Sequence, residues 1–221
     1  MADPSQIASQ LSSWLEWPTK LVVPLIALTG AFYTGLQYRR TMRWRSSDLA
    51  AQLIGQLTTD DELAFACQAL DWGVGPMIVP TRYKALMSKK PEDPDEPTPR
   101  ERGEIMDHDT SIMARALRIN LGFDYNTQPA GLIYRYCFDR LFSHLTNVHR
   151  LLETGQIRLE HLEGLTYWVK RIAVYEYPPA IGKPPVQMSG DEVFQPFIWH
   201  GEYGYLGVIA LGRTLKVDGM G

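Results

Sequence analysis

The chain has 221 residues, of which 45% are hydrophobic and 21% are charged, with a net charge of −3 and a pI near 6.0. This length suffices for one domain with a core, and the slightly acidic balance gives no electrostatic case for binding nucleic acid. The two cysteines, Cys67 and Cys137, lie far apart within apolar helical patterns. We expect buried free thiols in a reducing compartment, because no further metal ligands accompany them at short spacing.

The first apolar segment, residues 21–36, contains no ionisable side chain. Extended from Trp17 to Gln37, it reaches the ~20 residues that a helix needs to cross a bilayer. Aromatic rings that prefer the headgroup zone flank it: Trp14 and Trp17 on one side, Tyr38 and Trp44 on the other. A cleavable signal peptide would place its basic residues before the apolar run, and here they follow it. A buried core helix is the remaining alternative.

The charges around this segment predict its orientation. Lys20 is the only basic residue before the run, and four arginines follow it: Arg39, Arg40, Arg43 and Arg45. The positive-inside rule then places the N-terminus outside and the C-terminal part in the cytoplasm. We predict a short extracytoplasmic amphipathic segment at 1–16, a transmembrane helix with a basic juxtamembrane stretch at 17–45, and a cytoplasmic domain at 46–221 of a plasma-membrane protein.

Small residues recur on one face of the predicted membrane helix. Ala27, Ala31 and Gly35 are spaced by four, and Gly30 and Thr34 lie beside them. Such a stripe lets a second membrane helix approach closely, although small residues are also frequent in membrane helices generally. The expected partners are therefore the lipid bilayer and another membrane helix, from a second copy or from a different protein, and not nucleic acid.

The cytoplasmic part is predicted to be a helical bundle. Capping signals and apolar periodicity predict helices at 48–57, after Ser46 and Ser47, and at 60–71, 81–87, 104–120, 131–154 and 158–175. The last two are separated by a few residues, so we expect them to pack as an antiparallel pair. The acidic, proline-rich segment 88–103 reads as an exposed loop. For residues 194–216 helix and strand both stay open, with a helix at 202–215 favoured.

No catalytic signature is present in the sequence. The most suggestive polar groups are Asp107, His108 and Asp109, which could bind a divalent metal, and His200 with Glu202 beside aromatic residues. Polar helix faces and packed histidines explain the same residues without chemistry, and the second histidine that such a metal site needs is missing upstream. We therefore predict no metal, no cofactor and no catalytic residue, with an enzyme as the less favoured alternative.

Three segments resemble uncharacterised bacterial proteins with one N-terminal membrane helix and a small cytoplasmic helical domain: Tyr134–Phe142, Leu151–Ile157 and Tyr167-Trp168. The resemblance covers about a third of the chain and implies that architecture and a bacterial inner-membrane location. It carries no functional residue. The sequence predicts a membrane-anchored accessory, scaffolding or regulatory subunit. The alternatives are a membrane-tethered enzyme or effector, and a sensor that binds a ligand among the C-terminal aromatic residues.

Overall fold

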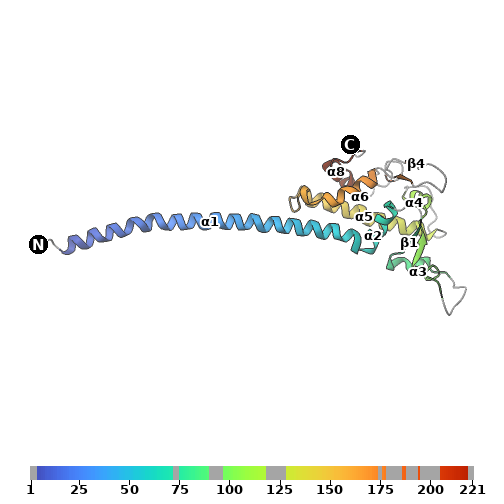
Figure 1. The fold of residues 1–221 in the computed structure, drawn as a ribbon, viewed down its shortest axis with the longest axis horizontal. Coiled ribbons are helices and arrows are strands. Elements are labelled where there is room, and N and C mark those ends of the chain that lie inside the picture. Colours follow the sequence, from blue (N-terminus) through green and yellow to red (C-terminus); the bar gives the residue numbers. More distant parts are fainter. Residues whose placement is uncertain are drawn as a thin grey trace. The chain divides into compact units, whose positions relative to one another are not determined.

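A computed structural model describes residues 4–71, 75–89, 97–117, 128–173, 176–177, 186–187, 194 and 205–218 (Figure 1). Side chains are described within these ranges for Val22 and from residue 24 onward, the strands at 176–177 and 186–187 excepted. The described chain is mainly helical, which confirms the predicted fold class at that level. It divides into two compact units, residues 1–46 and residues 47–221, and we call the second unit the helical domain.

The first helix, α1 (Pro4–Thr59), is 56 residues long and continues through both predicted N-terminal segments. The prediction of a new helix beginning after Ser46 and Ser47 is therefore wrong. A serine caps a helix only where the preceding backbone leaves the helical conformation. The residues just before these serines contain no glycine or proline, so the helix propagates through them. The C-terminal end of α1 buries Ala50, Leu53 and Leu57 in the core of the helical domain.

Helix α2 (Asp61–Asp71) confirms the predicted second helix. Its cap is Asp60, whose Oδ1 accepts hydrogen bonds from the backbone N–H groups of Glu62 and Leu63, both at 3.1 Å. Its Oδ2 accepts a hydrogen bond from Arg140 at 3.1 Å. Partial burial favours a higher pKa for Asp60, but these donors outweigh it and lower the pKa. The charged cap thus fastens α2 to the helix that carries Arg140.

Two short strands follow where the sequence predicted only loops and helix. Strand β1 (Pro76–Ile78) pairs antiparallel with β2 (Ile105–Asp107), with Met77 opposite Met106. Between them lie a 3-10 turn at Thr81–Tyr83 and α3 (Lys84–Met87), which agree with the predicted helical turns at 81–87. The helix predicted at 104–120 is wrong in its first half, because residues 105–107 take their hydrogen bonds from β1. Helix α4 (Thr110–Leu117) begins only after them.

Part of the predicted loop 88–103 is fastened to this region. Residues 90–96 lie outside the described residues. At the far end Gly103 has a φ of +71°, and a Cβ placed on it would lie 2.1 Å from the carbonyl oxygen of Lys84. Only glycine fits there, because a side chain would meet both an unfavourable backbone conformation and the neighbouring backbone.

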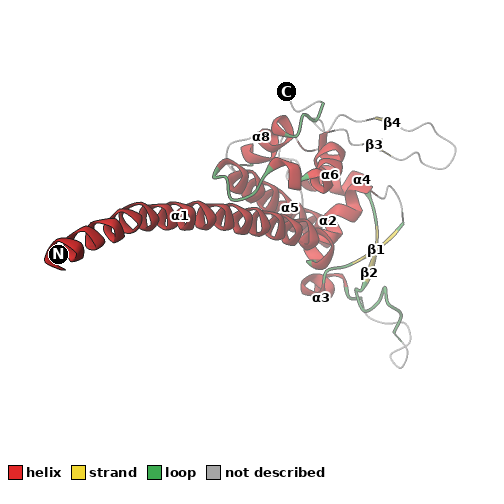
Figure 2. Ribbon diagram, turned by 60° about the vertical axis from the view of Figure 1, so that its left-hand side comes forward, coloured by secondary structure: helices red, strands yellow, loops and turns green. Residues whose placement is uncertain are grey.

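Helix α5 (Pro129–Glu153) is the centre of the helical domain (Figure 2). It packs against α2, α4 and α8 (Leu206–Thr214). Helix α6 (Glu163–Ala173), which follows a 3-10 turn at Leu159–His161, makes its main contacts with α8 and α2 instead. The predicted antiparallel pairing of α5 and α6 is not among these main contacts and stays a prediction. The buried faces, and not the short connection, decide which helices meet.

The core contains a cluster of packed aromatic rings. Phe194 lies against Phe138 and Phe142 of α5, with ring centroids 5.4 and 5.9 Å apart, and Tyr205 lies 5.7 Å from Phe142. Beside it, Gly207 of α8 lets that helix approach α5 closely. For residues 194–216 the structure gives a helix at 206–214, shorter than the favoured 202–215, and residues 195–204 lie outside the described residues. A second antiparallel pair, β3 (Glu176–Tyr177) with β4 (Val186–Gln187), completes the described elements.

Candidate functional site

The segment predicted to cross the membrane is part of α1, and all its described side chains from 24 to 45 are exposed. Large apolar groups cover much of its circumference, the small residues of the predicted contact face occupy the rest, and Leu28 and Trp44 are 71% and 77% exposed. The side chains of Trp14 and Trp17 lie outside the described residues. Within the described part of the chain, no helix combines the length and the apolar character that crossing a membrane requires.

The threonine hydroxyl groups in this segment donate to the helix backbone itself. Thr29 donates to the carbonyl oxygen of Leu25 at 2.8 Å, Thr34 to that of Gly30 at 2.8 Å, and Thr41 to that of Gln37 at 2.9 Å. Each hydroxyl donor is therefore satisfied without water, which is how threonine is accommodated in apolar surroundings.

The predicted small-residue face lies on this helix as expected from its spacing. Ala27, Ala31 and Thr34 are exposed, and a Cβ added to Gly30 or Gly35 would meet no atom within 4 Å. Nothing in the described residues covers the face, and its role in helix–helix contact stays a prediction.

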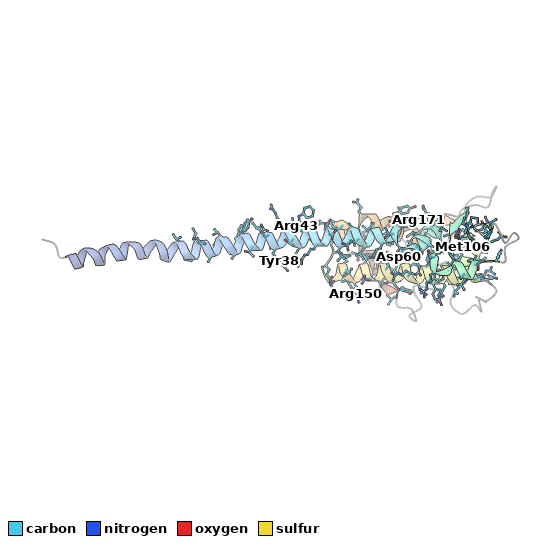
Figure 3. The ribbon with its side chains drawn as sticks, turned by 90° about the horizontal axis from the view of Figure 1, so that it is seen from below. Tyr38, Arg43, Asp60, Met106, Arg150 and Arg171 are labelled. Atoms are coloured by element: carbon cyan, nitrogen blue, oxygen red, sulfur yellow. The ribbon has the colours of Figure 1, made fainter. Side chains whose placement is uncertain are left out.

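Four exposed arginines follow the apolar segment, and we call them the arginine collar: Arg39, Arg40, Arg43 and Arg45. Among the described residues none of the four has an ion pair, and the printed sequence has no aspartate or glutamate between Glu16 and Asp48. Figure 3 marks Tyr38 and Arg43 on this part of α1. The collar is therefore a local excess of positive charge within a chain of net charge −3.

The predicted polar cluster at 107–109 is not one site, because its three side chains serve different elements. Asp107 is exposed and accepts two hydrogen bonds from Arg100, one of them at 2.8 Å. Asp109 caps α4 by accepting hydrogen bonds from the backbone N–H groups of Ser111 and Ile112. His108 is buried between them. His200 and Glu202 lie outside the described residues.

His108 forms a buried pair with Tyr134 of α5. The Nδ1 atom of His108 lies 2.6 Å from the Tyr134 hydroxyl oxygen, which also accepts a hydrogen bond from the backbone N–H of Asp109 at 3.1 Å. The Nε2 atom of His108 is buried without a hydrogen-bond partner among the described residues. Burial lowers the pKa of His108 to about 4, against a smaller opposing effect of Asp109, so the ring is neutral at pH 7. A neutral ring bonded to tyrosine fixes the start of α4 on α5.

A second polar group, which the sequence analysis missed, lies between α5 and α8. The Tyr205 hydroxyl donates to Asp139 at 2.8 Å, Ser143 donates to the Tyr205 oxygen at 3.5 Å, and Arg135 lies 3.9 Å from the Asp139 carboxylate. Burial raises the pKa of Asp139, although Tyr205 and Arg135 oppose it. The spacing of Arg135, Asp139 and Ser143 by four residues predicts that they share one helix face. No local pattern in the sequence predicts that Tyr205 is their partner. These contacts join the two helices.

A third polar group holds the C-terminal end of α2. The Tyr167 hydroxyl donates to the carboxylate of Asp71, and Arg171 donates to the carbonyl oxygen of Leu70 at 2.6 Å. Figure 3 marks Arg171 on α6. The bond from Arg171 satisfies a backbone carbonyl at the C-terminal end of α2 that has no partner within the helix. Together the two bonds attach α6 to α2.

The remaining ionisable groups of the described residues do not form a metal-binding cluster. His144 contacts the carbonyl oxygen of Leu53 at 3.0 Å, and His149 lies 3.6 Å from Glu153 on the same helix. Among the described residues, no three histidine, cysteine, aspartate or glutamate side chains lie together as metal ligands would. Both cysteines are free and buried, as predicted, and burial raises the pKa of the Cys67 thiol to about 12 and raises that of Cys137 as well. Neither is a reactive thiolate.

Comparison of the chain with protein-family models, with curated proteins and with solved structures finds no match.

Proposed function

We propose that the chain is a single-pass membrane protein whose helical domain serves interaction, as an accessory, scaffolding or regulatory subunit at the cytoplasmic side of a plasma membrane. The observation that carries this proposal is the segment 24–45 of α1, whose uncharged part exposes large apolar side chains on one side and small residues on the other, with its threonine hydroxyls satisfied internally. An apolar surface of this kind in water would be a large unfavourable exposure, and lipid removes it.

The dimensions of the segment support an anchor. At ~1.5 Å of rise per residue, a helix from Trp17 to Trp44 is about 40 Å long, close to the ~40–45 Å of a bilayer with its headgroups. The uncharged run 21–36 lies inside that span, and the arginine collar lies at its C-terminal edge. The orientation with the helical domain in the cytoplasm follows from the position of the collar.

The polar groups of the helical domain favour interaction over catalysis. Asp60, Asp109 and Asp71 cap or fasten helices, and His108 bonds to Tyr134. Each of these groups has a structural partner that accounts for its presence. The proposed interaction includes a second membrane helix on the face formed by Ala27, Ala31 and Gly35. Within a bilayer the hydrophobic effect does not drive helices together, so close packing of small residues must stabilise their contact.

Anchoring and orientation are tested together in cells. The chain should stay in the membrane pellet under alkaline carbonate extraction. A cysteine at Ser88, in the exposed chain after α3, should be shielded from an impermeant thiol reagent until lysis, and one at Ser5 should be labelled in intact cells. The two native cysteines are buried and leave a low background. Release by carbonate refutes the anchor, and labelling at position 88 in intact cells refutes the orientation.

The helix–helix contact is tested by filling the small-residue face. Ala31→Leu or Gly35→Leu should abolish association in a membrane two-hybrid assay and in co-purification from mild detergent. Thr29→Leu is the matched control, because position 29 lies about 160° around the helix from position 31 at ~100° per residue. If both face variants associate as well as the parent, the stripe has no role in contact, and interaction rests on the helical domain.

A further inference from the structure

We infer that the arginine collar binds the headgroups of anionic phospholipids, so that the chain selects a negatively charged lipid surface as well as a bilayer. The inference rests on the proposed function, since it requires that α1 lies in a membrane. It adds the chemical class of the partner, a lipid phosphate with net negative charge. It also assigns four residues to that partner.

The collar carries positive charge that no neighbouring carboxylate balances. Arg39, Arg40, Arg43 and Arg45 are all exposed, and none has an ion pair within the described chain. In the helical domain the exposed Arg82, Arg100 and Arg140 each lie within 4 Å of a carboxylate, whereas the exposed Arg115 has no ion pair among the described residues. Four guanidinium groups without a carboxylate partner in seven residues leave their donors open to water or to an external anion, and guanidinium binds phosphate oxygens in bidentate geometry.

The length of the collar along the helix axis matches the thickness of a lipid headgroup layer. From Arg39 to Arg45 the helix rises about 9 Å at ~1.5 Å per residue. This is close to the thickness of one headgroup layer, which is roughly 5–8 Å when a hydrocarbon core of ~30 Å is subtracted from a bilayer of ~40–45 Å. The exposed rings of Tyr38 and Trp44 lie at the two ends of the collar, where interfacial aromatic side chains belong.

The four arginines are distributed around the helix in a way that favours lipid over a macromolecular partner. At ~100° per residue, Arg40 and Arg43 lie about 100° and 40° from Arg39, and Arg45 lies on the opposite side at about 240°. A nucleic acid or a flat protein surface would reach only the first three. A ring of lipid headgroups surrounds the helix and can contact all four at once.

The test measures which lipid stays with the full chain. The protein is reconstituted into vesicles of equimolar phosphatidylglycerol and phosphatidylcholine, extracted in mild detergent and purified, and the retained lipids are quantified by mass spectrometry. One arginine near an anionic surface is worth about fivefold in binding. We expect at least about tenfold enrichment of phosphatidylglycerol. Changing all four arginines to glutamine should bring the ratio close to one, and changing all four to lysine should keep most of the enrichment.

The matched control changes four exposed cations of the helical domain to glutamine: Lys89, Arg115, Lys170 and Lys216. It alters net charge equally and should leave the enrichment at the parent value. Equal enrichment in the collar glutamine variant and the parent, or no enrichment in the parent, overturns the inference. Loss of enrichment in the control variant also overturns it, because the effect would then come from overall charge.

Two further arms separate the source of the phosphate. Inorganic phosphate at millimolar concentration should not displace the retained lipid, and displacement would assign the collar to a free anion. A single-stranded oligonucleotide should bind the parent and the collar glutamine variant equally weakly, and collar-dependent binding would assign it to nucleic acid. Carbonate extraction of the same vesicles separates the two proposals. If the chain stays in the membrane but shows no lipid preference, only the proposed lipid binding by the collar is refuted. If carbonate releases the chain, the proposed membrane anchor is refuted.

Discussion

Removing one hydroxyl, by Tyr134→Phe, tests the account of the buried histidine. The ring of Tyr134 is fully buried on α5. Its oxygen lies 2.6 Å from Nδ1 of His108 and accepts the N–H of Asp109 at 3.1 Å. Phenylalanine keeps the ring, its packing against Phe65 and the helix propensity nearly unchanged. The substitution therefore removes the hydroxyl oxygen and with it the two hydrogen bonds that attach the start of α4 to α5.

The expected loss follows from the groups that are left without this partner. A buried polar group without its hydrogen bond costs about 1–3 kcal/mol. Nδ1 of His108 is fully buried, and the other ring nitrogen is already without a hydrogen-bond partner among the described residues, so the histidine contributes the larger share. The Asp109 amide is only partly buried and contributes less. We expect the free energy of unfolding to fall by roughly 2–3 kcal/mol.

The assay is urea unfolding of the full chain in mild detergent, followed by near-ultraviolet circular dichroism of the packed aromatic residues. The matched control is Tyr136→Phe on the same helix, whose side chain is 48% exposed; it should change stability by less than about 0.5 kcal/mol. His108→Leu completes a double-mutant cycle with Tyr134→Phe, and the two losses should not add, since both remove the same contact. A Tyr134→Phe protein as stable as the control, or fully additive losses, would refute this account.

Three further outcomes can be measured on the same protein. Because the folded pKa of His108 is about 4 and the unfolded one 6.5, the unfolded chain binds more protons between these values. The stability that His108 contributes should therefore fall by about 3 kcal/mol from pH 7 to pH 4, and this part of the slope should be missing from urea titrations of His108→Leu. Gly207→Leu should lower the free energy of unfolding by at least about 2 kcal/mol in thermal unfolding, because its Cβ would lie 2.7 Å from an α5 side chain. The control Gly55→Ala, where a Cβ meets nothing within 4 Å, should raise it by up to about 1 kcal/mol. Equal effects of the two variants would contradict the close approach of α8 to α5. Cys67 and Cys137 should resist alkylation at pH 8 in the folded state and react in denaturant, and rapid labelling of the folded protein would show that the thiols are accessible.

The helical elements could be predicted wherever the signal is local. The capping pattern before α2 and the long apolar periodicity of α5 depend on residues within a few positions of each other, and both helices lie where these patterns predict them. The two cysteines are another local case, because apolar neighbours at helical spacing indicate burial. The start of α4 could also have been predicted, since Asp109 followed by Ser111 is a capping signal. The apolar periodicity over 104–120 favoured an earlier start instead.

Other features depended on partners far away in the sequence. Strand β2 exists because β1 lies beside it, and three residues have no periodicity of their own to reveal a strand. Likewise α1 passes through Ser46 and Ser47, because helix propagation outweighs a cap that the backbone does not need.

The sequence by itself determined the helical class, the apolar run at 21–36 and the arginines after it, since these depend on composition and local order. Tertiary structure alone decided that Asp107, His108 and Asp109 serve three different elements. Neighbours in sequence lie on opposite sides of a strand or cap, so proximity along the chain does not place their side chains together. It also decided that Asp139 meets Tyr205, 66 residues away, because the free energy of burying both helix faces brings α8 onto α5.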